Sequence, residues 1–195
     1  MSPAQLCAES WAEDSRIVNH IVRLTVTQAL ITSRFQQFSG SEQVGIALLY
    51  KEYIEMPQMI GAAAGGLKPC KRYIATHNDD GKSVYTESPD QLFNAVPGFG
   101  GLARSFSVNS VPANLTGDAD IKAYRAEEGA TSYTRREIVN PEPGANLLVV
   151  DLEPGAMSAM HRTVSIDFSI CVQGEIDHEL DGGEKVRLHP GVRLP

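Results

Sequence analysis

The sequence predicts a mainly β protein whose consecutive strands form an antiparallel sandwich or barrel, preceded by an N-terminal helical extension. Two observations carry this prediction. From residue 71 onward, short runs of apolar and β-branched residues are separated by turn-forming Gly, Asn, Asp and Pro residues, a spacing typical of all-β domains. The triplet Asp181-Gly182-Gly183 also joins two alternating runs, which is a strong hairpin signal.

Residues 1–66 are predicted to form the helical extension. Asp14 and Ser15 offer an N-cap for a helix over residues 16–36. The β-branched residues of this stretch oppose the assignment, because they lose rotamer freedom in a helix. A second short helix is predicted over 44–54, and residues 61–66 (GAAAGG) are expected to be a flexible joint. The apolar residues at helical spacing are Ile17, Ile21, Leu24, Ile31 and Phe35.

Residues 67–195 are predicted to form one β domain. The turn 78–81 joins its first two strands, because Asn, Asp and Gly tolerate left-handed backbone angles. Residues 89–114 are rich in Gly, Pro, Asn and Ser and are expected to form irregular loops around one short strand. The predicted strands are 72–76, 82–86, 104–108, 132–139, 145–152, 158–165, 168–173, 175–180 and 185–188.

The composition excludes several classes of function. The net charge of −7 argues against nucleic-acid binding, which needs clustered Lys and Arg. No segment approaches the ~20 apolar residues that cross a bilayer. The residues before the first apolar stretch are acidic, unlike those of a signal peptide, so a cytoplasmic protein is expected. Cys7, Cys70 and Cys171 lack CxxC spacing and indicate free thiols in a reducing compartment.

The stretch from Gly155 to Gly174 carries the chemical signal. His161 and Asp167 lie in a strand pattern that Gly174 closes. Alternation places His161 and Ser165 on one face of an extended chain, and a bend after Ser165 would bring Asp167 toward the same pocket. An imidazole and a carboxylate could then share one metal ion. His161 and Asp167 are therefore the predicted metal ligands.

This stretch resembles the first motif of small-molecule cupins, in which Gly, five residues, His-x-His, three or four residues, Glu, six residues and Gly follow one another. The chain has Gly155, five residues, His161-x-Thr163, three residues, Asp167, six residues and Gly174. The spacing matches, whereas Thr163 and Asp167 replace a His and a Glu.

Two further segments, VVDLEPG (149–155) and RYIATHNDDGKSVY (72–85), extend the resemblance to the single-domain cupins of fungal secondary-metabolite gene clusters. The resemblance implies a cupin-like jelly-roll barrel. A cupin's second motif supplies the last metal ligand, but here the chain reaches Leu188-His189-Pro190-Gly191 and stops four residues later. The barrel is therefore expected to be truncated at its C-terminal side.

The ligand count sets the expected metal affinity. His161 and Asp167 make two ligands, whereas a catalytic site usually has three, so Fe, Mn, Ni or Zn is expected to be held weakly. His77, His178 and His189 are the alternative third ligands, although a turn or a solvated edge explains each of them. Arginines that are weak candidates for binding a substrate carboxylate are Arg125, Arg135, Arg136 and Arg162.

The resemblance implies action on a small-molecule metabolite of polyketide type, as an oxidoreductase. A decarboxylase, dehydratase or isomerase of the same class stays open as an alternative, because a fold does not select its chemistry. A degenerate, non-catalytic cupin binding module is the rival from another class. The truncated form is expected to be inactive or nearly so. Its open strand edge predicts a homo-oligomer.

Overall fold

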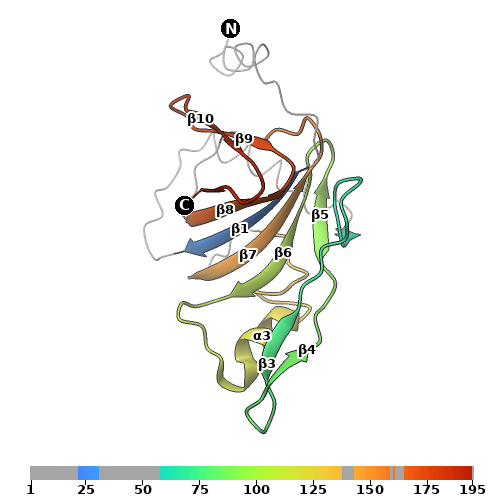
Figure 1. Cartoon of the computed structure of the whole chain (residues 1–195). Coiled ribbons are helices and arrows are strands. Elements are labelled where there is room, and N and C mark those ends of the chain that lie inside the picture. The colour runs from blue at the N-terminus through green and yellow to red at the C-terminus, as the bar shows by residue number, and fades with distance from the viewer. Residues whose placement is uncertain (1–21, 31–57, 138–142, 159, 161–164, 195) are drawn as a thin grey trace, which may run out of the picture.

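The computed structural model describes residues 22–30, 58–137, 143–158, 160 and 165–194, and it is mainly β. Seven strands form one sheet, in which every pair of neighbours is antiparallel, in the order β11-β8-β1-β7-β6-β5-β2 (Figure 1). In that order, the strands are Arg193–Leu194, Ile166–Gln173, Val22–Leu30, Gly144–Leu152, Gly100–Val108, Leu92–Val96 and Gln58–Ile60.

Two hairpins and one short helix complete the described elements. The β9–β10 hairpin lies toward one end of the sheet, whereas the β3–β4 hairpin and helix α3 lie toward the other (Figure 1). A 3-10 turn, η1, leads directly into α3. Their bounds are β3 Ile74–His77, β4 Ser83–Thr86, η1 Thr116–Asp118, α3 Ala119–Arg125, β9 Ile176–Glu179 and β10 Lys185–Leu188.

Strand β1 corrects the predicted N-terminal helix. It lies between β7 and β8, with Val22 opposite Leu152 and Leu30 opposite Gly144. The helix predicted over 16–36 is therefore wrong for residues 22–30. The β-branched residues in this stretch account for the outcome, because they fit a pleated surface better than a helix. The rest of 16–36 and the short helix predicted over 44–54 lie outside the described residues.

The run 61–66 also differs from its predicted role as a flexible joint. Ala63 is only 6% exposed and packs on Phe93, Ala103 and Val149. The backbone N–H of Ala63 donates to the buried carboxylate of Asp151 at 2.9 Å. This segment is therefore packed against the sheet. Strands from both sides of the boundary predicted at residue 66 hydrogen-bond within that one sheet.

Strand β7 supplies side chains to cores on both faces of the sheet, because successive residues of a strand point in opposite directions. On one face, Val150 and Leu152 pack with Cys171 and Leu188, and we call this the Val150 face. On the other, which we call the Val149 face, Val149 packs with the segment that contains Ala63. A third cluster near α3 contains Ile74, Ile121 and Tyr124.

The strand predictions agree with the structure where turns are local. The hairpin predicted at 72–86 is confirmed as β3–β4, and the one predicted at 175–188 is confirmed as β9–β10. The strand predicted at 145–152 is confirmed as β7 and the one at 168–173 as part of β8. The strand predicted at 132–139 is wrong for residues 132–137, which contain a turn at 133–134 and no strand. Most of the strand predicted at 158–165 lies outside the described residues.

The region 89–114 is more ordered than the sequence predicted. It contains β5 and the nine-residue strand β6, instead of loops around one short strand. A register shift between Arg104 and Phe106 interrupts the pairing of β6 with β7.

The described strands do not close into a barrel, so closure of the predicted jelly roll stays a prediction. Within the described residues, no helix is long and apolar enough to span a membrane.

Candidate functional site

Asp167, one of the two predicted metal ligands, lies near the start of β8. The hydroxyl of Ser165 donates to Asp167 Oδ1 at 2.6 Å, which holds the carboxylate against the turn that precedes the strand. Strand alternation places Asp167 on the same side of β8 as the buried Cys171, and therefore on the Val150 face. His161, the other predicted ligand, lies outside the described residues, as does Thr163.

Asp167 begins a row of polar residues that crosses four neighbouring strands. It lies opposite Gln28 of β1, which lies opposite Asn146 of β7, which in turn lies opposite Ser107 of β6. With about 4.8 Å between strands, the row spans about 14 Å. At its far end, the buried hydroxyl of Ser107 donates to Asn146 Oδ1 at 2.6 Å.

The same face becomes apolar further along the strands. Val150 and Leu152 follow Asn146 on β7, and Leu188 of the β9–β10 hairpin packs over them. Phe99 and Leu102 border this cluster. Ser107, Asn146, Val150, Leu152, Cys171 and Leu188 are each at most 7% exposed, so this part of the Val150 face is packed core with a polar end.

The described residues alone do not make a metal centre. No group of three or more His, Cys, Asp or Glu side chains is suitably placed in this part of the chain. His77 ends β3 and His178 lies in β9, so both are on hairpins outside the sheet that carries Asp167. His189 Nδ1 lies 3.1 Å from Glu175 Oε1 at the base of the β9–β10 hairpin. The structure therefore does not bring these three histidines to Asp167.

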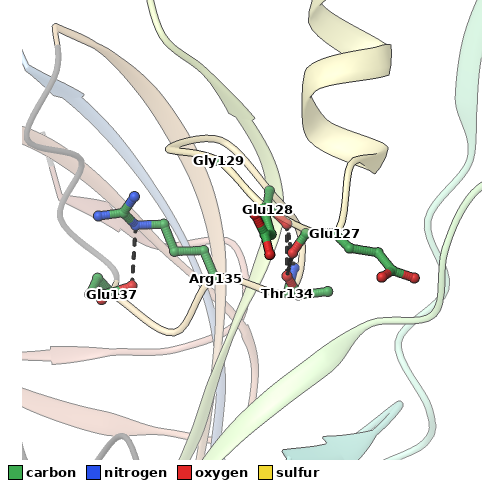
Figure 2. Close-up of a pocket in the computed structure, with 7 residues that line it drawn as sticks. Glu127, Glu128, Gly129, Thr134, Arg135 and Glu137 are labelled. Carbon is green, nitrogen blue, oxygen red and sulfur yellow. Dashed lines mark hydrogen bonds and ion pairs between the residues drawn. The ribbon is translucent and has the colours of Figure 1, made fainter.

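An open pocket of about 240 Å³ lies in the loop that follows α3 (Figure 2). Arg135 Nε pairs with Glu137 Oε2 at 3.2 Å on one side of it. On the other side, the hydroxyl of Thr134 donates to the Glu127 carbonyl at 2.6 Å. Much of this loop was predicted to be a strand, so the pocket was not predicted from the sequence. The lining residues are Glu127, Glu128, Gly129, Ser132, Thr134, Arg135 and Glu137.

Buried Arg104 of β6 fixes the shape of this loop. Its Nη1 donates to the Ala130 carbonyl at 2.6 Å and its Nη2 donates to the Glu137 carbonyl. The Gln58 amide adds a bond to the Thr134 carbonyl at 3.2 Å. Since these three carbonyls lie along the loop, the pocket is held in shape from the sheet.

The predicted carboxylate-binding arginines have protein partners where they are described. Arg125 pairs with Glu87, and Arg135 pairs with Glu137. Arg136 also has a partner, and Arg162 lies outside the described residues. The sequence reasoning missed Arg104 and Arg72, because nothing in the spacing of a lone arginine shows that it will be buried.

Arg72 is a structural anchor on the Val149 side of the sheet. It donates to the Ser105 carbonyl at 2.7 Å and to Ser88 Oγ at 2.9 Å, and it also contacts the Tyr124 hydroxyl. Burial lowers the pKa of Arg72 from its ordinary value, while the neighbouring Tyr124 acts in the opposite direction. These hydrogen bonds within the protein are enough to explain why a charged arginine is partly buried here.

Comparisons with known proteins give the evolutionary context. No family model matches the chain, and no solved structure matches it. The chain is 36% identical over 130 residues to phomopsin biosynthesis cluster protein C' of Diaporthe leptostromiformis, covering 64% of this chain and 65% of that protein. It is 32% identical over 127 residues to oryzines biosynthesis cluster protein J of Aspergillus oryzae, covering 62% and 65%.

The name of a third relative states which domain that protein contains. The chain is 32% identical over 130 residues to a cupin-domain-containing oxidoreductase of Neurospora crassa, covering 66% of this chain and 62% of that protein. The matched segment thus spans less than two thirds of each of these relatives. The matches support the resemblance inferred from residues 155–174, because the chain is similar both to fungal biosynthesis-cluster proteins and to a fungal cupin-domain-containing oxidoreductase.

Proposed function

We propose that this chain acts on a small molecule in fungal secondary-metabolite biosynthesis, as a cupin-type oxidoreductase. The observation that carries the proposal is the position of Asp167, which is half-buried on the Val150 face. It belongs to the segment that resembles the first cupin motif, and cupin-domain oxidoreductases are among the homologues. The substrate class that we propose is a polyketide-derived phenol or aldehyde, as the resemblance implies.

The metal part of the proposal assigns His161 and Asp167 as ligands of a divalent ion such as Fe, Mn, Ni or Zn. The support for this assignment is that the Ser165 hydroxyl donates to Asp167 Oδ1 at 2.6 Å and so orients the carboxylate. Second-layer hydrogen bonds of this kind orient metal ligands and tune their affinity. With only two ligands, the ion would be held weakly.

A non-catalytic cupin module that binds a metabolite is the second candidate. The two-ligand count of the motif favours it, because catalytic metal sites usually have three protein ligands. A decarboxylase, dehydratase or isomerase would use the same face. All of these candidates need a bound small molecule, and they differ in whether that molecule is converted.

Gene deletion with complementation tests the proposal in the native host. Deletion should remove one secondary metabolite and accumulate its precursor, as seen by mass spectrometry of culture extracts. Wild-type protein and an Asp177→Asn variant should restore the profile, because Asp177 lies on the exposed side of the β9–β10 hairpin. Asp167→Asn and His161→Ala should not restore it. The candidate site is wrong if the Asp167→Asn variant complements fully, and the proposed function is wrong if deletion leaves every metabolite unchanged.

Self-association is the second part of the proposal. Outward-facing Ile166, Phe168 and Val172 of β8 are each about half exposed, and Phe168 is 49% exposed. Next to β8, the two-residue strand β11 pairs only with Ser169 and Ile170. An apolar strand near a sheet edge favours pairing with a second copy of the chain.

A further inference from the structure

Two tyrosine pairs of nearly the same geometry occur among the described residues. The ring centroids of Tyr73 and Tyr85 are 5.7 Å apart with an interplanar angle of 56°. Those of Tyr124 and Tyr133 are 6.2 Å apart with an angle of 55°. The two pairs differ mainly in environment, since the first is exposed and the second lies in the cluster around Ile74 and Ile121.

The exposed pair lies on the outer face of the β3–β4 hairpin. Tyr85 of β4 is opposite Ala75 of β3, and Tyr73 precedes Ala75 by two residues. Residues two apart in an extended chain share a face, so the rings of Tyr73 and Tyr85 are diagonal neighbours beside a small alanine. Tyr73 is 73% exposed and Tyr85 is 77% exposed, so a solvent-borne oxidant can reach both phenols.

The inner face of the hairpin keeps the two rings together. Ile74 is buried against Ile121 and Tyr124, and the Thr76 hydroxyl donates to Asp118. The Asn78 N–H and the Lys82 carbonyl close the turn at 3.0 Å. The backbone that carries Tyr73 and Tyr85 is therefore fixed, whereas exposed side chains change rotamer on the picosecond to nanosecond timescale. Ring rotation can bring the ortho carbons together without any change of fold.

We propose that Tyr73 and Tyr85 form an oxidative modification site, at which the two rings couple into an intrachain dityrosine. A peroxide-driven haem peroxidase removes one electron and one proton from each phenol. The two phenoxyl radicals then form a carbon–carbon bond between their ortho positions, and the ring hydrogens return to the oxygens by tautomerisation. Hydrogen peroxide takes up the two electrons and two protons and becomes two water molecules.

The buried pair provides an internal control. The hydroxyl of Tyr124 donates to the Arg104 carbonyl at 2.8 Å, and its ring has no exposed surface. Burial raises the pKa of Tyr124 to about 12, so the phenol keeps its proton. A difference in coupling between the two pairs would therefore follow from exposure, because the spacing of the rings is nearly equal.

The test treats the purified full chain with horseradish peroxidase and hydrogen peroxide. The expected product is a chain with dityrosine fluorescence and no covalent bond to a second chain, and its digest should contain a cross-linked Tyr73–Tyr85 peptide pair that has lost two hydrogen atoms. Peroxide also oxidises exposed methionines, and Met157 and Met160 are both exposed, so the assignment is made on the cross-linked peptides. Tyr73→Phe and Tyr85→Phe should each abolish the cross-linked pair, and Tyr133→Phe should leave its yield unchanged.

Phenylalanine keeps the ring and removes only the hydroxyl, so the hairpin should keep its packing in these variants. The proposal would be overturned by three results. The first is the absence of dityrosine. The second is dityrosine found only in covalent dimers. The third is coupling of Tyr124 with Tyr133 in a yield equal to that of the exposed pair.

Discussion

The buried carboxylate of Asp151 accepts a hydrogen bond from the backbone N–H of Ala63 at 2.9 Å, across 88 residues of sequence. This bond joins the segment 61–66 to the middle strand of the sheet. Ala63 also lies directly over Gly101 of β6, where a Cβ would come within 2.6 Å of the Ala63 Cβ. The segment before β3 and the Val149 face of the sheet are therefore packed as one unit.

This packing predicts the effect of a side chain at Gly101. Gly101→Ala should destabilise the fold by about 1–3 kcal/mol, the usual effect of overpacking. The reason is that the new Cβ would lie 2.6 Å from Ala63 Cβ and 2.8 Å from the Asn94 carbonyl oxygen. Chemical denaturation monitored by circular dichroism measures the change.

Gly65→Ala is the matched control for Gly101→Ala. A Cβ at Gly65 would meet no atom of the described chain within 4 Å, and neither glycine has a positive φ angle. The control variant should keep the wild-type stability or gain slightly, because alanine restricts the unfolded chain. Equal losses in the two variants would contradict the packing of Ala63 on Gly101.

The elements that the sequence predicted well are those set by local turns. The Asn78 to Gly81 turn and the Asp181 to Gly183 turn fixed two hairpins, because turn chemistry acts within a few residues. Strand β1 was mistaken for a helix, because its state depends on β7 and β8, more than 100 residues away in sequence. Helix α3 was missed because it is short and has no side-chain cap.

The candidate site was predictable only in part, for a similar reason. The motif spacing singled out Asp167 because its neighbours in sequence carry the resemblance. Asn146 and Ser107 were not singled out, because only the register of four strands places them in line with Asp167. Register between distant strands is set by tertiary packing and cannot be read from local alternation.

The β9–β10 hairpin predicts a pH effect on stability. Arg187 Nε and Nη2 donate to the two oxygens of Asp177 at 2.7 and 2.8 Å. These bonds lower the pKa of Asp177 from its ordinary value of 3.8, with burial acting in the opposite direction. Because the folded-state pKa is the lower one, the stabilisation is present above the unfolded-state pKa and is lost as the pH falls through the folded-state pKa.

Asp177→Asn should therefore lower the melting temperature slightly at neutral pH. The difference from wild type should shrink as the pH falls below 3.8 and should disappear below the lowered folded-state pKa, where the folded wild-type carboxylate is also protonated. Asp80→Asn in the exposed β3–β4 turn is the control, and thermal melts over a pH series make the comparison. A difference between Asp177→Asn and wild type that persists unchanged in strong acid would show that the ion pair is not its cause.

The outward side chains of β8 predict self-association. Phe168→Glu should shift the chain toward monomer, because a charge on the apolar strip opposes burial between two copies. Multi-angle light scattering over a concentration series measures the mass. Val111→Glu, at a residue that is 67% exposed in the loop before η1, should leave the mass distribution unchanged. A wild-type chain that stays monomeric at every concentration would contradict the proposed self-association.

The last prediction concerns metal affinity, and it follows from the number of ligands. Only His161 and Asp167 stand at ligand spacing, and among the described residues no three-ligand group is present. Two ligands fix fewer coordination positions than the three that hold a catalytic ion, so Zn²⁺ should bind with a dissociation constant far above that of a three-ligand site. Isothermal titration calorimetry of the apo chain with Zn²⁺ measures this constant.

His161→Ala and Asp167→Asn should each abolish the binding, while Asp177→Asn, which removes an exposed carboxylate from a different element, should leave it unchanged. Since Ser165 orients the carboxylate at 2.6 Å, Ser165→Ala should weaken Zn²⁺ binding by about 10-fold, the lower end of the effect of losing a second-layer partner. Tight, stoichiometric metal in the purified wild-type chain would contradict the two-ligand count and would require a further ligand beyond His161 and Asp167.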